Sequence, residues 1–415
     1  MTEAELATQV MKRIEALARV TEEPGCLTRT YGSPAMRRAN DRVAGWMREA
    51  GMTTREDAIG NLIGHYPGAR TEARAKTLLL GSHLDTVRDA GKFDGALGVL
   101  LAVACVDYLN ARNKRLPFAL DVVGFADEEG VRYQTTYLGS RALAGTFNPE
   151  DLKRVDAAGI SMVEAIRAFR GDPAALSDAR RGPQTLLGYV EVHIEQGPVL
   201  DKAGISVGAV SAISGQTRIQ AHFTGQARHA GTTPMDLRQD ALVAAAEFIL
   251  MTEQIARDNP ELVATVGQIR ALPGASNVIP GDVTLSVDVR HPLDEKRLTA
   301  CEELHVKARS MTTRRGVVID WDVVQNTASV SCACQLSDLL IEAARRHQVF
   351  VPVLPSGAGH DAAALSTIIP VAMLFVRCKE GVSHHPGESV QADDVRVAIA
   401  VMNDFLDLLA RQPDG

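Results

Sequence analysis

The residues best suited to chemistry follow an apolar strand early in the chain. His83, Asp85 and Asp94 stand within residues 81–96, directly after three leucines at 78–80. A neutral histidine nitrogen binds a borderline metal, one carboxylate can bridge two metals, and another can orient the histidine from behind. Because His-x-Asp pairs also occur in hydrogen-bonded loops, this stretch alone leaves a metal site and a plain loop both open.

Three adjacent acids, Asp127, Glu128 and Glu129, follow a second apolar run within residues 118–130. Neighbouring acids repel one another and are common in solvated loops. Directly after so apolar a strand, however, they would lie at the rim of a sheet, where ligands gather in open α/β folds. A bound metal would relieve their repulsion.

Two further segments bring histidines. Within residues 188–197, strand alternation places Glu191 and His193 on the same face. Residues 382–388 read Val-Ser-His-His-Pro-Gly-Glu, with adjacent histidines at 384 and 385. These segments complete a set of candidate metal ligands, which consists of His83, Asp94, Glu129, His193 and His384.

This set divides naturally between two metals. With Asp94 bridging, each metal would receive three protein ligands and keep an open position for water, as catalytic sites do. Asp85 then supports His83 from behind, and Glu128 serves as the general base for the bridging water. Histidines with carboxylates suit zinc, manganese or cobalt, and the affinity order does not decide among them.

The order of these segments and their residue sequences resemble one family over nearly the full length of the chain. The chain resembles the dinuclear metal-dependent amidohydrolases of the aminoacylase and carboxypeptidase-G-type metallopeptidase superfamily. Within it, the similarity is to the branch of allantoate amidohydrolases, N-carbamoyl-L-amino-acid hydrolases and β-ureidopropionases, marked by a histidine at His193 where most members have an acid. The family pattern Ser-His-x-Pro-x-Glu favours His384 over His385 as a ligand, although two adjacent histidines keep both open.

The resemblance also implies substrate contacts. Taken alone, His229 is a turn histidine, Asn277 a turn former and Arg290 a surface ion-pairing residue. All three match family positions at which the histidine stabilises a developing oxyanion while the asparagine and arginine hold the substrate carboxylate. In that family these residues reach the metals of the opposite subunit, so the resemblance implies a homodimer with shared active sites.

Two more segments match the family near the substrate. Gln216, in a Gly-Gln-x-Arg run, resembles the allantoate-hydrolysing members, where an extra amide would bind the second ureido arm. Gly359 and His360, followed by Asp361, match a Gly-His-Asp segment that lines the site, and we expect a positioning role for them.

The elements that must position these residues change character along the chain. Strands and helices alternate to about residue 210, which predicts an α/β fold with a mostly parallel sheet and helices on both faces. Residues 150–186 interrupt the rhythm and are expected to form a helical excursion over the surface. A capping box, Thr2-x-x-Glu5, opens the first helix.

A smaller domain is inserted into this α/β domain. Its pattern predicts a split βαβ unit, ferredoxin-like, with strands near 219–223, 263–272, 283–289 and 317–324 and helices at 238–257 and 294–312. We therefore expect a catalytic metal domain at 1–212 and 330–415, and an inserted domain at 213–329. In the resembling family the inserted domain acts as a lid and makes the dimer interface.

Composition limits the remaining possibilities. The 415 residues are 46% hydrophobic and 23% charged, with a formal net charge of −7, which gives nucleic acid no electrostatic support. No apolar run is long enough for a membrane span, and the N-terminus has no signal-peptide pattern. Six scattered cysteines are expected to be free thiols in a reducing cytoplasm.

The functional hypothesis is metal-assisted hydrolysis of a ureido C–N bond in a small carboxylate-bearing substrate. Allantoate, with release of ammonia and carbon dioxide, is favoured by Gln216. The alternatives are hydrolysis of an N-carbamoyl-L-amino acid or of a β-ureidopropionate. A non-catalytic binding protein on the same fold is the alternative from another class.

Overall fold

The computed structural model describes residues 1–70 and 76–412. The chain divides into two compact units. Unit 1 comprises Met1–Ser211, Cys332–Leu354 and Ala358–Gly415, and unit 2 comprises Ala212–Ser331 and Pro355–Gly357. The short return at 355–357 has no signal in the residue pattern. It belongs with unit 2 through backbone contacts such as Ser214 N–H to the Ser356 carbonyl, at 2.9 Å.

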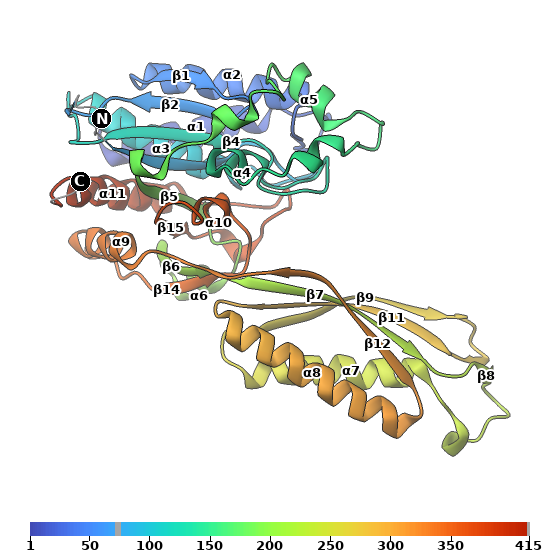
Figure 1. Cartoon of the computed structure of the whole chain (residues 1–415). Coiled ribbons are helices and arrows are strands. Elements are labelled where there is room, and N and C mark those ends of the chain that lie inside the picture. Colours follow the sequence, from blue (N-terminus) through green and yellow to red (C-terminus); the bar gives the residue numbers. More distant parts are fainter. Residues whose placement is uncertain (71–75, 413–415) are drawn as a thin grey trace. The chain divides into compact units, whose positions relative to one another are not determined.

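The central sheet is parallel in its middle and antiparallel at its flanks (Figure 1). Its order is β1-β2-β4-β3-β5-β15-β6-β13, with β14 beside β6. The strands are β1 (Thr53–Glu56), β2 (Leu62–Tyr66), β3 (Thr77–His83), β4 (Ala119–Phe125), β5 (Leu186–Ile194), β6 (Val207–Ile213), β13 (Val330–Ser331), β14 (Val353–Ser356) and β15 (Val371–Val376). The predicted α/β class is confirmed, and strands β4, β3, β5 and β15 form the parallel middle of the sheet.

The larger hydrophobic core of unit 1 joins one face of this sheet to a helical layer. The helices of this layer are α1 (Glu3–Ala18), α2 (Pro34–Glu49), α3 (Ala96–Asn110), α9 (Cys334–Arg346) and α11 (Ala392–Leu409). The predicted capping box at Thr2 and Glu5 is present in α1. Helix α3 is apolar on all sides, and it is correspondingly buried between the sheet and both α1 and α11.

Short helices make up the rest of unit 1, and those at 138–144 and 162–168 contribute to a second core, which includes Tyr31, Ala126 and Leu138. These helices are α4 (Leu138–Ala144), α5 (Met162–Ala168), α6 (Val199–Ala203) and α10 (Asp361–Leu365), with 3-10 turns η1 (Pro149–Lys153), η2 (Leu176–Ala179), η3 (Pro183–Thr185) and η5 (Lys379–Gly381). The predicted excursion at 150–186 is thus a series of short helical turns. Within the described residues, no helix is long and apolar enough to cross a membrane.

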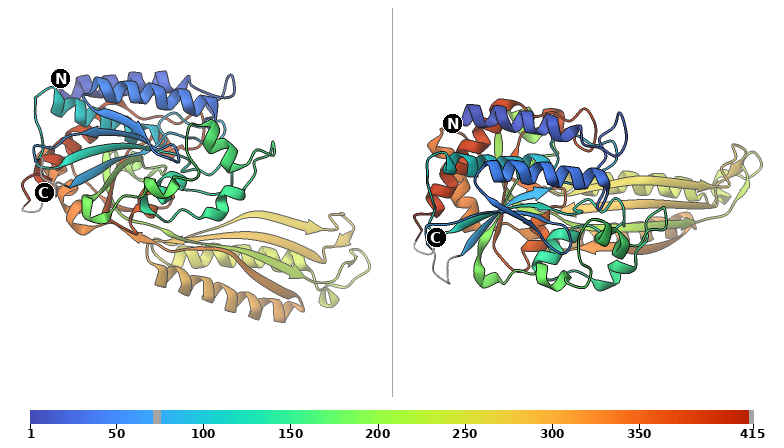
Figure 2. Two further views of the ribbon diagram at one scale, coloured as in Figure 1. Left: turned by 45° about the horizontal axis from the view of Figure 1, so that its top comes forward. Right: turned by 90° about the horizontal axis from the view of Figure 1, so that it is seen from above.

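Unit 2 is a four-stranded antiparallel sheet, ordered β12-β7-β11-β9, with two helices on one face (Figure 2). Its elements are β7 (Gly215–Thr224), β8 (Arg228–His229), η4 (Met235–Leu237), α7 (Ala241–Asp258), β9 (Val263–Leu272), β10 (Val278–Ile279), β11 (Asp282–His291), α8 (Asp294–Arg315) and β12 (Val318–Thr327). This is the order of the predicted split βαβ unit. Helix α7 begins later than expected because Asp240 caps it, accepting from the backbone N–H groups of Leu242 and Val243.

Strand β11 shows why the two faces of this sheet differ. Val283 and Leu285 are buried against α7 and α8, together with Val287 and Val289. The alternate residues from Thr284 to Arg290 are only partly buried and lie on the opposite, open face. Unit 2 therefore has one apolar face in its core and one polar face.

Candidate metal centre

Parallel strands bring the candidate residues of unit 1 to one edge of the sheet. His83 is the last residue of β3, His193 is the last but one of β5, and Glu128 and Glu129 lie in the loop just after β4. Strands β4, β3, β5 and β15 are mutually parallel, so their carboxyl ends meet at the same edge. His384 comes from the segment that follows β15.

Asp94 lies between two histidines from opposite parts of the chain. Its Oδ1 is 3.1 Å from Nε2 of His193, and its Oδ2 is 3.1 Å from Nε2 of His384. The next residue, Gly95, has a φ of 63°, and a Cβ there would lie 2.5 Å from the ring of His83. Only glycine therefore lets the loop bring Asp94 this close to the histidines.

Among the described residues, four groups of potential ligand atoms lie at this centre, and two of them share Asp94. His83, Asp94 and His193 form one, and Asp94, Glu129 and His384 form the other, with the ligand atoms of each within 4.8 Å of one another. Nitrogen and carboxylate donors together suit zinc, manganese or cobalt, so the residues present fit metal binding. The structure thus brings all five predicted ligands together, and it places His384 rather than His385 against Asp94.

The electrostatics of the site also favour a bound cation. Burial raises the pKa of Glu129 to about 7, and burial together with the charge of Glu129 raises the pKa of Glu128 well above its ordinary value. Burial opposes ionisation of Asp94, but hydrogen bonds with His193 and His384 outweigh it and hold the pKa of Asp94 well below normal. A divalent ion would offset the repulsion among these acids.

Backbone carbonyl groups fix the tautomers of two histidines. Nδ1 of His83 lies 3.0 Å from the carbonyl oxygen of Asp85, and Nδ1 of His193 lies 2.9 Å from that of Ile194. A carbonyl oxygen only accepts, so Nδ1 carries the proton in both rings. Nε2 of each ring is then the nitrogen that faces the centre, and in His193 a metal would replace the proton that Nε2 shares with Asp94.

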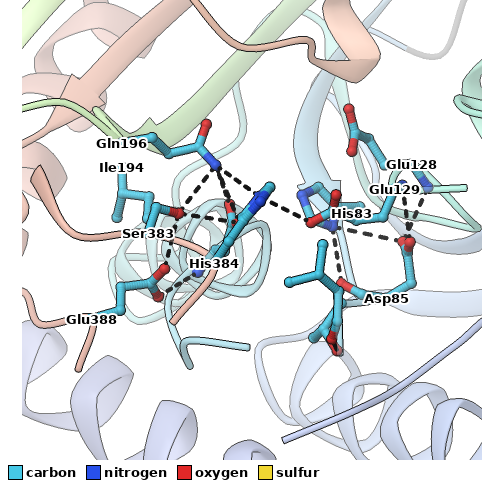
Figure 3. A network of polar contacts seen from close by, with 12 residues as sticks. His83, Asp85, Glu128, Glu129, Ile194, Gln196, Ser383, His384 and Glu388 are labelled. Atoms are coloured by element: carbon cyan, nitrogen blue, oxygen red, sulfur yellow. Dashed lines mark hydrogen bonds and ion pairs between the residues drawn. The ribbon is translucent and has the colours of Figure 1, made fainter. Parts of the chain in front are cut away.

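The Asp85 carboxylate has a different principal task from the one expected (Figure 3). Its two oxygens accept from the backbone N–H groups of Glu128 and Glu129, each at 3.1 Å. Its Oδ1 is 3.6 Å from Nδ1 of His83, beyond hydrogen-bond length. Asp85 therefore orients His83 through its backbone, while its side chain holds the loop that carries Glu128.

Two residues outside the predicted set support Asp94. Glu388 accepts from the backbone N–H groups of Phe93 and Asp94, at 2.7 and 3.1 Å, and also from the Ser383 hydroxyl at 3.1 Å. Gln196 donates from Nε2 to both oxygens of Asp94 at 3.2 Å. Both stand inside the recognised motifs, but contacts across about 100 to 300 residues have no signal in one sequence.

The segment with Gly359 and His360 lies beside the centre. The rings of His360 and His193 are 4.6 Å apart, and both side chains are buried. Asp361 accepts from the Ser140 hydroxyl at 2.5 Å. Glu191, also buried, accepts from the Ser82 hydroxyl at 2.7 Å and from the backbone N–H of Ala362 at 3.2 Å.

The candidate substrate-binding residues of unit 2 fall into two groups. Gln216 and Arg290 face each other across β7 and β11. His229 pairs with Val278 across β8 and β10, and the carbonyl of Asn277 accepts from Ala230 at 2.9 Å. Strands β8 and β10 form a separate two-stranded sheet that lies beyond the other end of the β7–β11 ladder, at Thr224 and Asp282 (Figure 1). At ~3.4 Å a residue, the eight steps from Asp282 to Arg290 separate the groups by at least ~27 Å.

The fold and the site together define a hydrolase with a histidine and carboxylate centre that can hold metal. The chain belongs to peptidase family M20/M25/M40, which matches residues 79–408. It is a hydrolase that acts on C–N bonds. The resemblance drawn from the motifs is thereby confirmed.

Relatives of known name cover nearly the whole chain. It is 42% identical to an N-carbamoyl-L-amino acid amidohydrolase of Geobacillus stearothermophilus, over 95% of this chain and 96% of the relative. It is 39% identical to a probable allantoate deiminase of Oryza sativa subsp. japonica, over 97% and 88%. A hydantoinase/carbamoylase family amidase from Burkholderia multivorans superposes with a TM-score of 0.92 at 30% identity, over 98% of both chains.

The shared position of Asp94 predicts how metal binding responds to substitution. We expect Asp94→Asn to retain less metal after dialysis than either His193→Ala or His384→Ala, because Asp94 belongs to both ligand groups. Elemental analysis of the dialysed proteins measures this. His347→Ala is the matched control, since His347 pairs with Asp404 outside the centre. Equal metal retention by Asp94→Asn and the wild type would contradict the assignment.

Proposed function

We propose that the chain hydrolyses a ureido C–N bond of a small carboxylate-bearing substrate, with two divalent ions in each subunit. The observation that carries this proposal is the pair of ligand groups sharing Asp94, with Glu128 beside them. His83 and His193 would hold one ion, Glu129 and His384 the other, and Asp94 both. The chemistry that zinc, manganese or cobalt supplies in such a centre is a lowered pKa of water and polarisation of the carbonyl oxygen.

Glu128 is the proposed proton carrier. It takes a proton from the attacking water as the new C–O bond forms, and it gives this proton to the leaving nitrogen as the C–N bond breaks. Burial and the neighbouring Glu129 raise the pKa of Glu128, which helps the carboxylate to accept a proton. Asp85 holds the backbone of Glu128 in place for both transfers. The carbamate released in this way breaks down to ammonia and carbon dioxide.

Replacement of Glu128 tests this role. We expect Glu128→Gln to keep its metal and its melting temperature while kcat falls by roughly 10²- to 10⁴-fold, the usual contribution of a positioned acid–base group. Steady-state kinetics with parallel metal analysis measures both properties. A kcat near that of the wild type, with metal content unchanged, would remove Glu128 as the base.

Allantoate is the proposed substrate, with N-carbamoyl-L-amino acids and β-ureidopropionate as the alternatives. Gln216 supports allantoate because a second ureido arm needs an additional polar partner. The names of the relatives support ureido substrates in general, since both allantoate and N-carbamoyl amino acid hydrolases match over most of the chain.

A direct comparison of substrates decides among these possibilities. Ammonia release should be measured side by side from allantoate, N-carbamoyl-L-amino acids and N-carbamoyl-β-alanine, after incubation with manganese, cobalt or zinc. We expect the highest kcat/KM for allantoate. A higher value for either other substrate would favour the corresponding alternative. No activity with any metal would favour a non-catalytic binding protein.

We also propose that two copies of the chain share each active site. The polar groups of unit 2 support this, because ~27 Å of antiparallel ladder separates Arg290 from Asn277 and His229. One small ureido acid cannot span both groups of a single chain. A site that takes Arg290 from one copy, and Asn277 and His229 from the other, would bring all three residues to one substrate, whereas the resemblance implied that all three come from the opposite copy. His229 would then act on the developing oxyanion in the partner's site.

Mixed subunits test the sharing of sites. We expect inactive His229→Ala and Glu128→Gln proteins to recover activity when mixed, because one of the two sites in a heterodimer then has both residues intact. Ammonia release after subunit exchange measures the recovery, and each variant mixed with itself is the control. If exchange is demonstrated by differently tagged subunits and no activity returns, His229 does not act in trans.

A further inference from the structure

Asp288, which the sequence does not single out, is the centre of a polar cluster on the open face of unit 2. Arg290 donates to it from Nε and Nη2, at 2.8 and 2.9 Å. Gln216 donates from Nε2 at 2.6 Å, and Arg218 from Nε at 3.3 Å. Arg218, Asp288 and Arg290 line an open groove of about 1360 Å³ along this face.

Asp288 determines which way the amide of Gln216 points. An ionised carboxylate only accepts hydrogen bonds, so the short contact must come from the NH₂ group of Gln216 rather than from its oxygen. Hydrogen bonds from Arg290, Gln216 and Arg218 outweigh burial and hold the pKa of Asp288 below its ordinary value, which keeps it ionised at neutral pH. Within the described part of the chain, Oε1 of Gln216 has no donor of its own.

The Asp288 carboxylate also fixes the orientation of the Arg290 guanidinium and offsets part of the positive charge around it. Two parallel hydrogen bonds to Asp288 and a third, from Nη1 to the Gly357 carbonyl at 2.6 Å, hold the guanidinium in one orientation. Within the cluster, Arg218 and Arg290 bring two positive charges and Asp288 brings one negative charge. This balance suits a substrate with a single carboxylate.

We propose that Asp288 is a positioning residue that sets substrate preference by turning Gln216 so that its Oε1 accepts from an N–H donor of the substrate. The ligand group recognised is a second ureido arm, as in a bis-ureido acid, and a second carboxylate would be repelled there. The proposal rests on the proposed ureido hydrolysis. It assigns to Asp288 the discrimination between substrates that the sequence alone would assign to Gln216.

The preference between two substrates isolates this effect. The readout is the kcat/KM for allantoate divided by that for N-carbamoyl-L-alanine, measured on the metal-loaded full chain. We expect Asp288→Asn to lower this ratio by roughly 2- to 12-fold, the equivalent of one neutral hydrogen bond. The loss should fall mainly on the KM for allantoate. Misplacement of Arg290 weakens binding of the carboxylate common to both substrates, so it cancels in the ratio.

A double-mutant cycle shows whether Asp288 acts through Gln216. We expect Gln216→Leu to lower the ratio by a similar factor, and Asp288→Asn to change it less than 2-fold further in that background. An equal change in both backgrounds would overturn the proposal. If Asp288→Asn lowers the melting temperature, Gln216→Leu alone tests the acceptor, because it leaves the Asp288 pair with Arg290 in place. An unchanged ratio in Gln216→Leu would then overturn the proposal.

Asp282→Asn is the matched control. Asp282 lies on the same strand and face, accepts from His222 at 2.7 Å and stands six residues, or ~20 Å, from Asp288. Its substitution should leave the ratio unchanged, and a change equal to that of Asp288→Asn would overturn the proposal. An active wild type whose ratio does not respond to Asp288→Asn overturns this inference alone. A wild type that hydrolyses neither ureido acid overturns the proposed function as well.

Discussion

The structure depends on one constraint, which is that a carboxylate taken out of water must be paired with positive charge or with hydrogen-bond donors. Asp94 meets this constraint with His193 on one oxygen and His384 on the other. These partners come from strands and loops about 100 and 290 residues away in the chain, so pairing Asp94 also closes the fold of unit 1. The same convergence creates a centre suited to metal.

The supporting residues extend this constraint from side chains to the backbone. Glu388 holds the amide groups of Phe93 and Asp94, and Asp85 holds those of Glu128 and Glu129. The Glu388 carboxylate thus fixes the segment that carries Asp94, and the Asp85 carboxylate fixes the segment that carries Glu128 and Glu129. Because backbone amides cannot rotate away as side chains can, such contacts restrict the acids more firmly than side-chain pairs would. The backbone contacts therefore hold the acids of the centre in fixed positions relative to one another.

Much of this arrangement is predictable from the sequence, and there is a physical reason why the rest is not. The apolar runs before His83 and Glu128 and the alternation around His193 predict strand ends, because local periodicity encodes them. The separation of the candidate substrate-binding residues of unit 2 into two groups depends on the length of the β7–β11 pairing. The motifs around His229 and Arg290 carry no information about this length. Likewise, the tasks of Asp85, Gln196 and Asp288 depend on which neighbour their side chains meet, and that is a tertiary property.

The long ladder of β7 and β11 has a further consequence. The ladder has ten paired positions, from Gly215–His291 to Thr224–Asp282, and Gln216–Arg290 is one of them. The number of paired residues therefore sets the distance between the two polar groups. An insertion of two residues in both strands would lengthen it by ~7 Å and leave every side chain on its original face. An insertion of one residue in each would exchange the polar and apolar faces beyond that point. Unless a β-bulge absorbs the extra residue, paired strands can keep their faces only when they lengthen in even steps, so the spacing between the two polar groups changes in discrete amounts.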